Sequence, residues 1–112
     1  MRIEIHAEGI TLDRVARSRI EQELRGALGH YAARITSATV YVRDTNGPRG
    51  GPGQQCRIVV NLLRSSRIVV SGMDTDVPPL IKCTAERAGY AVRRHFNRRR
   101  SGMRRDKVHA IS

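Results

Sequence analysis

Three consecutive segments in the middle of the chain alternate apolar and polar residues, and this feature restricts the possible folds more than any other. The alternation covers residues 35–43, 55–64 and 67–73, which are rich in β-branched side chains. A period of two places every second side chain on one face of a β-strand. The first connection, residues 44–53, holds four Gly and two Pro and predicts a loop, while Ser65-Ser66 predicts a tight turn. The three segments therefore predict consecutive antiparallel strands.

A further strand and a helix are expected before these segments. Residues 2–8 also alternate, which predicts a half-buried strand. Apolar residues then recur every three or four positions, as in an amphipathic helix that packs on a sheet. These residues are Ala16, Ile20, Leu24, Ala27 and Tyr31. We expect Thr11 or Asp13 to cap this helix, because each offers a side-chain oxygen to free N–H groups. Gly26 and Gly29 should weaken its last turns.

A second helix is expected after the last strand. Asp76 is a suitable N-cap, and the prolines that follow are tolerated in a first helical turn. An apolar stripe begins at Val77 and predicts a helix that ends near residue 97. Residues 98–112 contain six cations and almost no apolar residues, so a disordered basic tail is expected there.

The predicted element order is β-α-β-β-β-α within one α+β domain, residues 1–97. A right-handed first crossover makes the first two strands parallel, and hairpins add the others. The result is a four-stranded mixed sheet with two helices packed on one face. No apolar run approaches the ~20 residues of a membrane span. The N-terminal alternation differs from a signal peptide, so we expect a cytoplasmic protein.

The charge of the chain predicts a polyanionic partner. Lys and Arg total 21, of which 19 are Arg, against 10 Asp and Glu, for a net charge of +11. Residues 57–112 carry 13 basic and four acidic side chains, so the second half supplies most of the excess. Such an excess repels itself in the absence of a counter-charge. Arginine forks also suit bidentate contacts to phosphate.

Patterns typical of catalysis or metal binding are missing. The four His residues lack the HExxH spacing, there is no GxSxG, and the Gly-rich residues 47–53 lack the Lys-Ser/Thr of a phosphate-binding loop. Cys56 and Cys83 match no zinc or redox motif, and we expect both to remain reduced without a disulfide. We therefore expect neither an enzyme nor a metal or cofactor site.

The second helix is expected to bind RNA. Two rows of cations flank its apolar stripe: Lys82, Arg93 and Arg100 in one, and Arg87, Arg94 and Arg98, with Tyr90 alongside, in the other. Because Glu86 is the one acidic residue among them, these rows suit a helix that lies along a phosphate backbone. Arg14 and Arg25 on the first helix are further candidate contacts.

Two other functions stay open at this point. The middle strands offer one aromatic residue, Tyr41, which favours recognition of RNA backbone and shape over stacking on single strands. A stand-alone binder of double-stranded RNA or DNA would use the same basic helix. A protein-interaction module would use the partly apolar sheet face away from the helices. That face is expected to hold Tyr41, Val59, Leu63, Val69 and Met73.

The chain resembles the ribosome hibernation promoting factor family, also called ribosome-associated inhibitor or sigma-54 modulation protein. The similarity covers residues 1–96 and is carried by the segment ITSATVYV and by Asp74, Asp76, Ile81, Arg87, Arg93, Arg94 and His95. This resemblance implies a non-enzymatic protein that binds the small ribosomal subunit where messenger and transfer RNA would lie, and silences translation. It implies contacts from Arg87, Arg93 and Arg94 to ribosomal RNA. It also implies a short form, without the C-terminal domain that pairs ribosomes.

Overall fold

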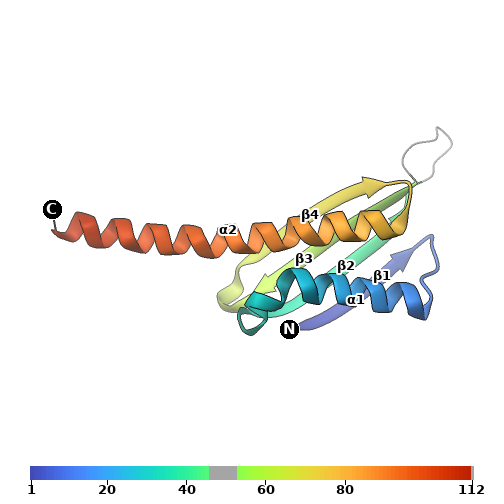
Figure 1. Ribbon diagram of the computed structural model, residues 1–112, viewed down its shortest axis with the longest axis horizontal. Helices are drawn as coiled ribbons and strands as arrows, with labels where there is room; N and C mark the ends of the chain where they lie inside the picture. Colours follow the sequence, from blue (N-terminus) through green and yellow to red (C-terminus); the bar gives the residue numbers. More distant parts are fainter. Residues whose placement is uncertain (46–52, 112) are drawn as a thin grey trace.

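The computed structural model describes the backbone of residues 1–45 and 53–111 and the side chains of residues 1–45 and 53–98. One four-stranded sheet carries two helices on the same face (Figure 1). The strands are β1 (Arg2–Glu8), β2 (Ile35–Asp44), β3 (Gln54–Leu62) and β4 (Arg67–Asp74). The helices are α1 (Arg14–Leu28) and α2 (Val77–Ile111), with short 3-10 helices η1 (Gly29–Arg34) and η2 (Leu63–Ser65).

The sheet topology confirms the predicted mixed sheet. The spatial order is β1-β2-β3-β4, with β1 parallel to β2 and the other neighbours antiparallel. The register aligns Ile5 with Val40 and Val40 with Ile58, so apolar positions of adjacent strands stay in phase. This phase leaves one sheet face apolar for the helices and the other face open.

The core is aliphatic, as the low aromatic content requires. The inward positions of the central strands and the stripes of both helices are buried. They include Ile20, Leu24, Leu28, Val40, Val42, Ile58, Val60, Ala88 and Val92. Phe96 and Tyr31 pack at the margin of this core. Phe96 is therefore the last described residue of α2 that helps to close the core.

The start and end of α1 follow from local chemistry. Asp13 caps the helix, because its Oδ1 accepts a hydrogen bond of 2.7 Å from the backbone N–H of Ala16. Of the two expected caps, Thr11 is thus not the one used. The α-helix ends at Leu28, directly before Gly29, and the chain continues as η1. The expected weakening at the glycines therefore appears as a change to 3-10 geometry.

Two glycines let α2 lie close to its neighbours. A Cβ on Gly72 of β4 would stand 2.8 Å from Thr84 Oγ1, and one on Gly89 would stand 2.8 Å from the Ala27 carbonyl oxygen of α1. Both distances are shorter than a normal contact. Because glycine has no side chain at either position, α2 can pack closely against β4 on one side and against α1 on the other.

The structure differs from the sequence-based expectation at two element ends. Strand β3 ends at Leu62 and the turn is Leu63–Ser65, where Arg64 and Ser65 have φ of 69° and 68°. A left-handed conformation at arginine has no sequence signal, since it is rare outside glycine and asparagine.

The second difference concerns α2, which does not end near residue 97. It continues to Ile111, where a disordered tail was expected. Residues 98–111 contain no proline and are mostly Arg, Lys, Met and Ala, which favour a helix. The division into a domain at residues 1–97 and a tail at 98–112 stays a prediction. Most of the expected loop at 44–53, residues 46–52, lies outside the described residues.

Candidate nucleic-acid interface

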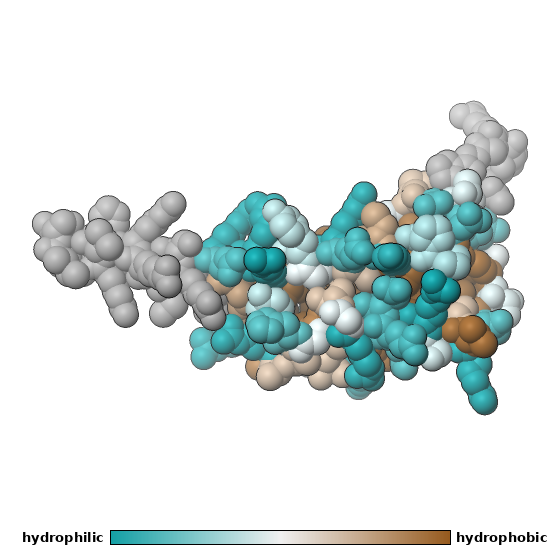
Figure 2. Space-filling model, in the orientation of Figure 1, coloured by the Kyte–Doolittle hydropathy of each residue, from teal (hydrophilic) through white to brown (hydrophobic). Residues whose placement is uncertain are grey.

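The outer side of α2 presents a row of basic side chains to solvent. Lys82, Arg87, Arg93, Arg94 and Arg98 are all exposed, and Tyr90 among them is 63% exposed. The side chain of Arg100, which was also expected here, lies outside those that the structure describes. Figure 2 shows that the helix-covered face of the molecule is largely hydrophilic. We call Lys82, Tyr90, Arg93, Arg94 and Arg98 the basic face of α2.

The cations lie on both shoulders of α2, as the sequence predicts. Arg93 and Tyr90 line a groove between α1 and α2, together with His30 and Tyr31. Arg87 lies on the opposite shoulder and reaches β4, where its Nη1 donates a hydrogen bond of 2.9 Å to the Ser71 carbonyl. A surface that approaches α2 from solvent therefore meets cations from both sides.

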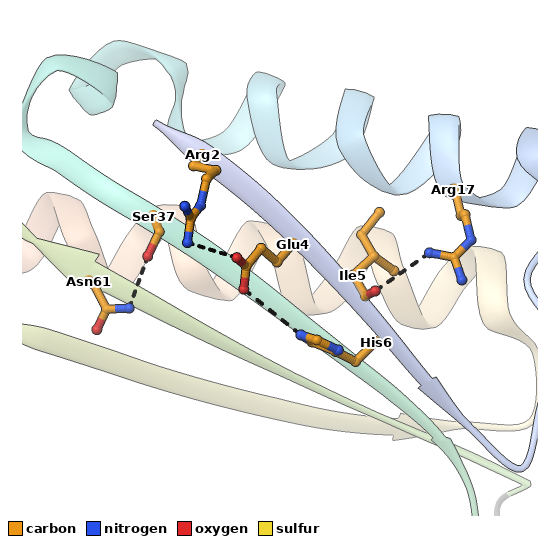
Figure 3. Close-up of polar contacts among 7 residues, drawn as sticks. All are labelled: Arg2, Glu4, Ile5, His6, Arg17, Ser37 and Asn61. Carbon is orange, nitrogen blue, oxygen red and sulfur yellow. Dashed lines mark hydrogen bonds and ion pairs between the residues drawn. The ribbon is translucent and has the colours of Figure 1, made fainter.

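The hydrogen bond of Arg87 changes the role expected for it. Strand β4 is at the edge of the sheet, where free carbonyl groups invite pairing with another chain. Arg87 satisfies one of these carbonyls. At the other edge, Arg17 of α1 extends Nη1 to the Ile5 carbonyl of β1 at 3.5 Å (Figure 3). Arg87 is thus partly engaged in covering a sheet edge, so we leave it out of the basic face of α2.

Tyr90 and Arg94 form one unit on the basic face. The Arg94 guanidinium carbon lies 5.6 Å from the centroid of the Tyr90 ring, within the range of a cation–π contact. Such a contact restricts the arginine side chain and leaves its N–H donors free for an acceptor. Tyr90 was expected beside the row of Arg87, Arg94 and Arg98, and its contact with Arg94 agrees with this, but Tyr90 also lines the groove with Arg93 of the other row.

The positive charge of the basic face exceeds the negative charge beside it, which comes from Glu86 in the groove with Arg93 and Tyr90. Among the side chains described, Arg2 is the only arginine or lysine in an ion pair, with 2.8 Å between its Nη2 and Glu4 Oε1. None of the cations on the basic face has a carboxylate partner within the described part of the chain. Their attraction is therefore available to an external anion.

Arg14 and Arg25 do not join the basic face. Both are exposed on α1 and lie 11 positions apart, hence on one side of the helix. Ala27, which approaches α2 at Gly89, lies two positions after Arg25 and about 200° further around the helix. Arg14 and Arg25 therefore point away from α2.

One basic residue of this region was missed from the sequence. The Arg34 guanidinium carbon lies 5.0 Å from the Phe96 ring centroid, and Phe96 stacks on Tyr31 with centroids 5.1 Å apart. Arg34 belongs to η1 and Phe96 to α2, so this interaction joins residues far apart in the chain. No local sequence pattern at Arg34 predicts its contact with Phe96.

The two cysteines and the histidines form no recognisable reactive site in the part of the chain that the structure describes. Cys56 is buried on β3 and Cys83 is exposed on α2, and both are free thiols. Burial raises the pKa of the Cys56 thiol to about 11, against a smaller lowering by its hydrogen bond with the Thr84 side chain. No group of three or more potential metal ligands occurs among the residues searched, which are those the structure describes. In the same residues, no helix combines the length and the apolar character that membrane crossing requires.

The open face of the sheet has the predicted apolar residues with one exception. Tyr41, Val69 and Met73 are 43%, 48% and 54% exposed, and Val59 pairs with Val69 across β3 and β4. Leu63 is also exposed, but it belongs to η2 and lies outside the sheet. The face that could hold a protein partner is thus interrupted by polar neighbours such as Arg57 and Asn61.

Comparisons with known proteins establish the fold. Neither the protein-family models nor the curated proteins give a match. Among solved structures, a ribosomal subunit interface protein from Coxiella burnetii is similar with a TM-score of 0.71 and 13% identity, over 87% of this chain and 99% of that one. The N-terminal domain of Thermus thermophilus Protein Y is similar with a TM-score of 0.69 and 19% identity, over 85% of this chain and 99% of that one. The β-α-β-β-β-α architecture is therefore shared with these two proteins.

Proposed function

We propose that this protein is a non-enzymatic factor that binds ribosomal RNA of the small ribosomal subunit and silences translation. The observation that carries the proposal is the basic face of α2, whose cations have no carboxylate partner in the described part of the chain. The shared fold supports the choice of target, because one neighbour is named as a ribosomal subunit interface protein. In this proposal the protein works in the cytoplasm and needs no cofactor.

The geometry suits binding along an RNA backbone. Phosphates repeat along a helical groove, and a straight α-helix with cations on its outer side can follow them over several nucleotides. Arg93 stands at the groove beside α1, while Arg94 is held on the Tyr90 ring. Silencing would follow from occupancy alone, since a protein seated where messenger RNA lies excludes it.

The decisive experiment measures binding to purified small subunits as a function of salt. Arg93, Arg94 and Arg98 are replaced together by Ala. The logarithm of the affinity falls linearly with the logarithm of the salt concentration, and the slope is proportional to the number of phosphates neutralised. This slope should therefore become flatter by up to roughly three units, about one for each arginine replaced. Circular dichroism checks the fold, which should survive because all three side chains are exposed.

A matched control removes the same charge elsewhere. Arg14, Arg19 and Arg25 are exposed on α1 and are replaced together by Ala. This variant should keep the wild-type slope, apart from a small uniform effect of net charge. An unchanged slope in the folded α2 variant, or an equal flattening in the α1 variant, would contradict the assignment to α2.

A second assay distinguishes specific binding to the ribosome from binding to double-stranded nucleic acid in general. A stand-alone binder of double-stranded RNA or DNA would bind a blunt duplex of about 16 base pairs as tightly as it binds small subunits. Our proposal expects clearly tighter binding to the small subunit, and inhibition of translation in a cell-free system at matching concentrations. Equal affinities would favour the general nucleic-acid binder.

A further inference from the structure

The open face of the sheet carries a pair of stacked rings on β1 and β2. His6 and Tyr41 are directly paired in the parallel register, with ring centroids 5.2 Å apart and planes 17° from parallel. Both side chains are exposed, Tyr41 by 43%. The open face is the side of the sheet away from α1 and α2. This ring pair is therefore separate from the basic face of α2.

His6 has a charged neighbour on the same strand, Glu4. The Glu4 carboxylate pairs with Arg2 through Oε1 at 2.8 Å and lies 3.9 Å from His6 Nε2 through Oε2 (Figure 3). Since Arg2 already neutralises Glu4, this carboxylate repels an approaching anion only weakly. The stack of His6 on Tyr41 restricts both rings before any ligand arrives, which lowers the entropy lost on binding.

Two arginines stand next to the rings. Arg57 pairs directly with Tyr41 across β2 and β3, and Arg43 follows Tyr41 by two positions on the same face. Neither arginine side chain forms a hydrogen bond or ion pair with another described residue, and both line a hollow with His6, Tyr41 and Gln55. Glu8, which is paired in register with Arg43, is the one acidic residue in the hollow. The hollow therefore combines an exposed aromatic surface with more positive than negative charge.

We propose that this hollow binds one unpaired nucleotide of an RNA strand. The base would stack on the face of the Tyr41 ring that is turned away from His6, and the phosphate beside it would be bound by Arg57 and Arg43. Stacking on aromatic side chains together with a cationic path for the backbone is the general means of binding single-stranded nucleic acid. An acidic peptide could use the arginines but would leave the ring surface without a partner. This inference does not depend on the proposed function of α2, since it concerns the opposite face of the sheet.

The test uses an oligoadenylate of about ten nucleotides, because adenine stacks strongly and the strand has no duplex structure. Binding is measured in about 150 mM salt, where non-specific attraction is screened. Tyr41→Ala should weaken binding by roughly fivefold or more, while Tyr41→Phe keeps the ring and should retain most of the affinity. Arg57→Ala should weaken binding and reduce its salt dependence by about one unit.

Matched controls keep the experiment decisive. Met73→Ala removes an apolar residue that is 54% exposed on β4, outside the hollow, and should leave binding unchanged. Because the chain has no tryptophan, Tyr41→Trp supplies a single reporter whose fluorescence should be quenched by the oligonucleotide.

Three results would overturn the site. These are a folded Tyr41→Ala variant that binds the oligonucleotide as wild type does, a Tyr41→Phe variant that loses as much affinity as Tyr41→Ala, or an equal loss in Met73→Ala. A blunt duplex and the Arg93, Arg94 and Arg98 variant provide the separate test of α2. Failure of one proposal is thus distinguishable from failure of the other.

Discussion

The two cysteines show how strongly a residue depends on its surroundings. Cys56 is buried among core residues, and its thiol is held in the protonated form by a pKa of about 11. Cys83 is exposed on α2. Because the thiolate is the reactive species, the two side chains should differ sharply in reactivity.

A thiol-reactive reagent tests this difference at neutral pH. We expect the native protein to react quickly at one cysteine and the denatured protein at both. Cys83→Ser should abolish the fast reaction in the native state. Fast labelling of Cys56 in a folded Cys83→Ser variant would show that β3 opens readily.

The same burial predicts a pH dependence of stability. The Cys56 pKa is raised from its ordinary value of 9.0 to about 11 in the folded protein, so the folded state holds its proton more firmly than the unfolded state. The resulting stabilisation is complete below about pH 9 and is lost as the pH rises towards 11. Denaturant unfolding of wild type should therefore show a steeper decline over this interval than that of Cys56→Ala. Parallel curves would contradict the raised pKa.

For Arg87, the position on the helix could be predicted from the sequence, but its hydrogen-bond partner could not. Its position on the shoulder of α2 follows from helical spacing, and that part of the prediction is confirmed. The Ser71 carbonyl that it binds is brought there by packing of α2 against β4. A hydrogen bond between elements has no signature in local spacing, so the engagement of Arg87 could not be predicted.

At the scale of elements, glycines in α1 and α2 have opposite roles. Gly26 of α1 is exposed, and a Cβ built on it meets nothing within 4 Å. A Cβ on Gly89 of α2 would stand 2.8 Å from the Ala27 carbonyl oxygen, a backbone atom that cannot rotate away. Glycine at position 26 therefore lowers the helix propensity of α1 without any gain in packing, whereas glycine at position 89 is required for the close packing of α1 and α2.

Alanine substitutions at these two glycines should change stability in opposite directions. Gly26→Ala should raise the free energy of unfolding by about 0.5–1 kcal/mol, because alanine is the better helix former. Gly89→Ala gains the same propensity but forces the helices apart, and should lower the free energy of unfolding by about 1–3 kcal/mol. Chemical denaturation of both variants measures the contrast. Stabilisation by Gly89→Ala would mean that α1 and α2 pack less tightly than the structure shows.

The element order could be predicted because periodicity and capping are local properties. Alternation in residues 35–43 and the Asp13 cap each depend on neighbours within a few positions, and both are confirmed. The left-handed turn at Arg64 and the end of α2 could not be predicted in the same way. The turn is imposed by the pairing of β3 with β4, and the expected end of α2 rested on the scarcity of apolar residues, which removes packing but not helix propensity.

At the scale of the whole molecule, part of the positive charge belongs to a segment of α2 that follows the last described core residue. The described core closes at Phe96, whereas α2 continues to Ile111 and extends beyond the sheet (Figure 1). Residues 101–112 carry Arg104, Arg105 and Lys107 against one acidic residue. Folding and RNA affinity should therefore respond differently to removal of this segment.

Removal of residues 101–112 should leave the melting temperature within a few degrees of wild type, since the last described core residue of α2, Phe96, is retained. The same truncation should weaken binding to small subunits and flatten its salt dependence by up to about three units, one for each cation removed. A full-length variant with Arg104, Arg105 and Lys107 replaced by Ala should bind much like the truncated chain, because both lose the same three cations, although the truncated chain also loses Asp106. A large fall in the melting temperature would instead show that the segment packs on the domain. Wild-type binding by the truncated chain would confine the RNA-binding surface to the part of α2 that lies over the sheet.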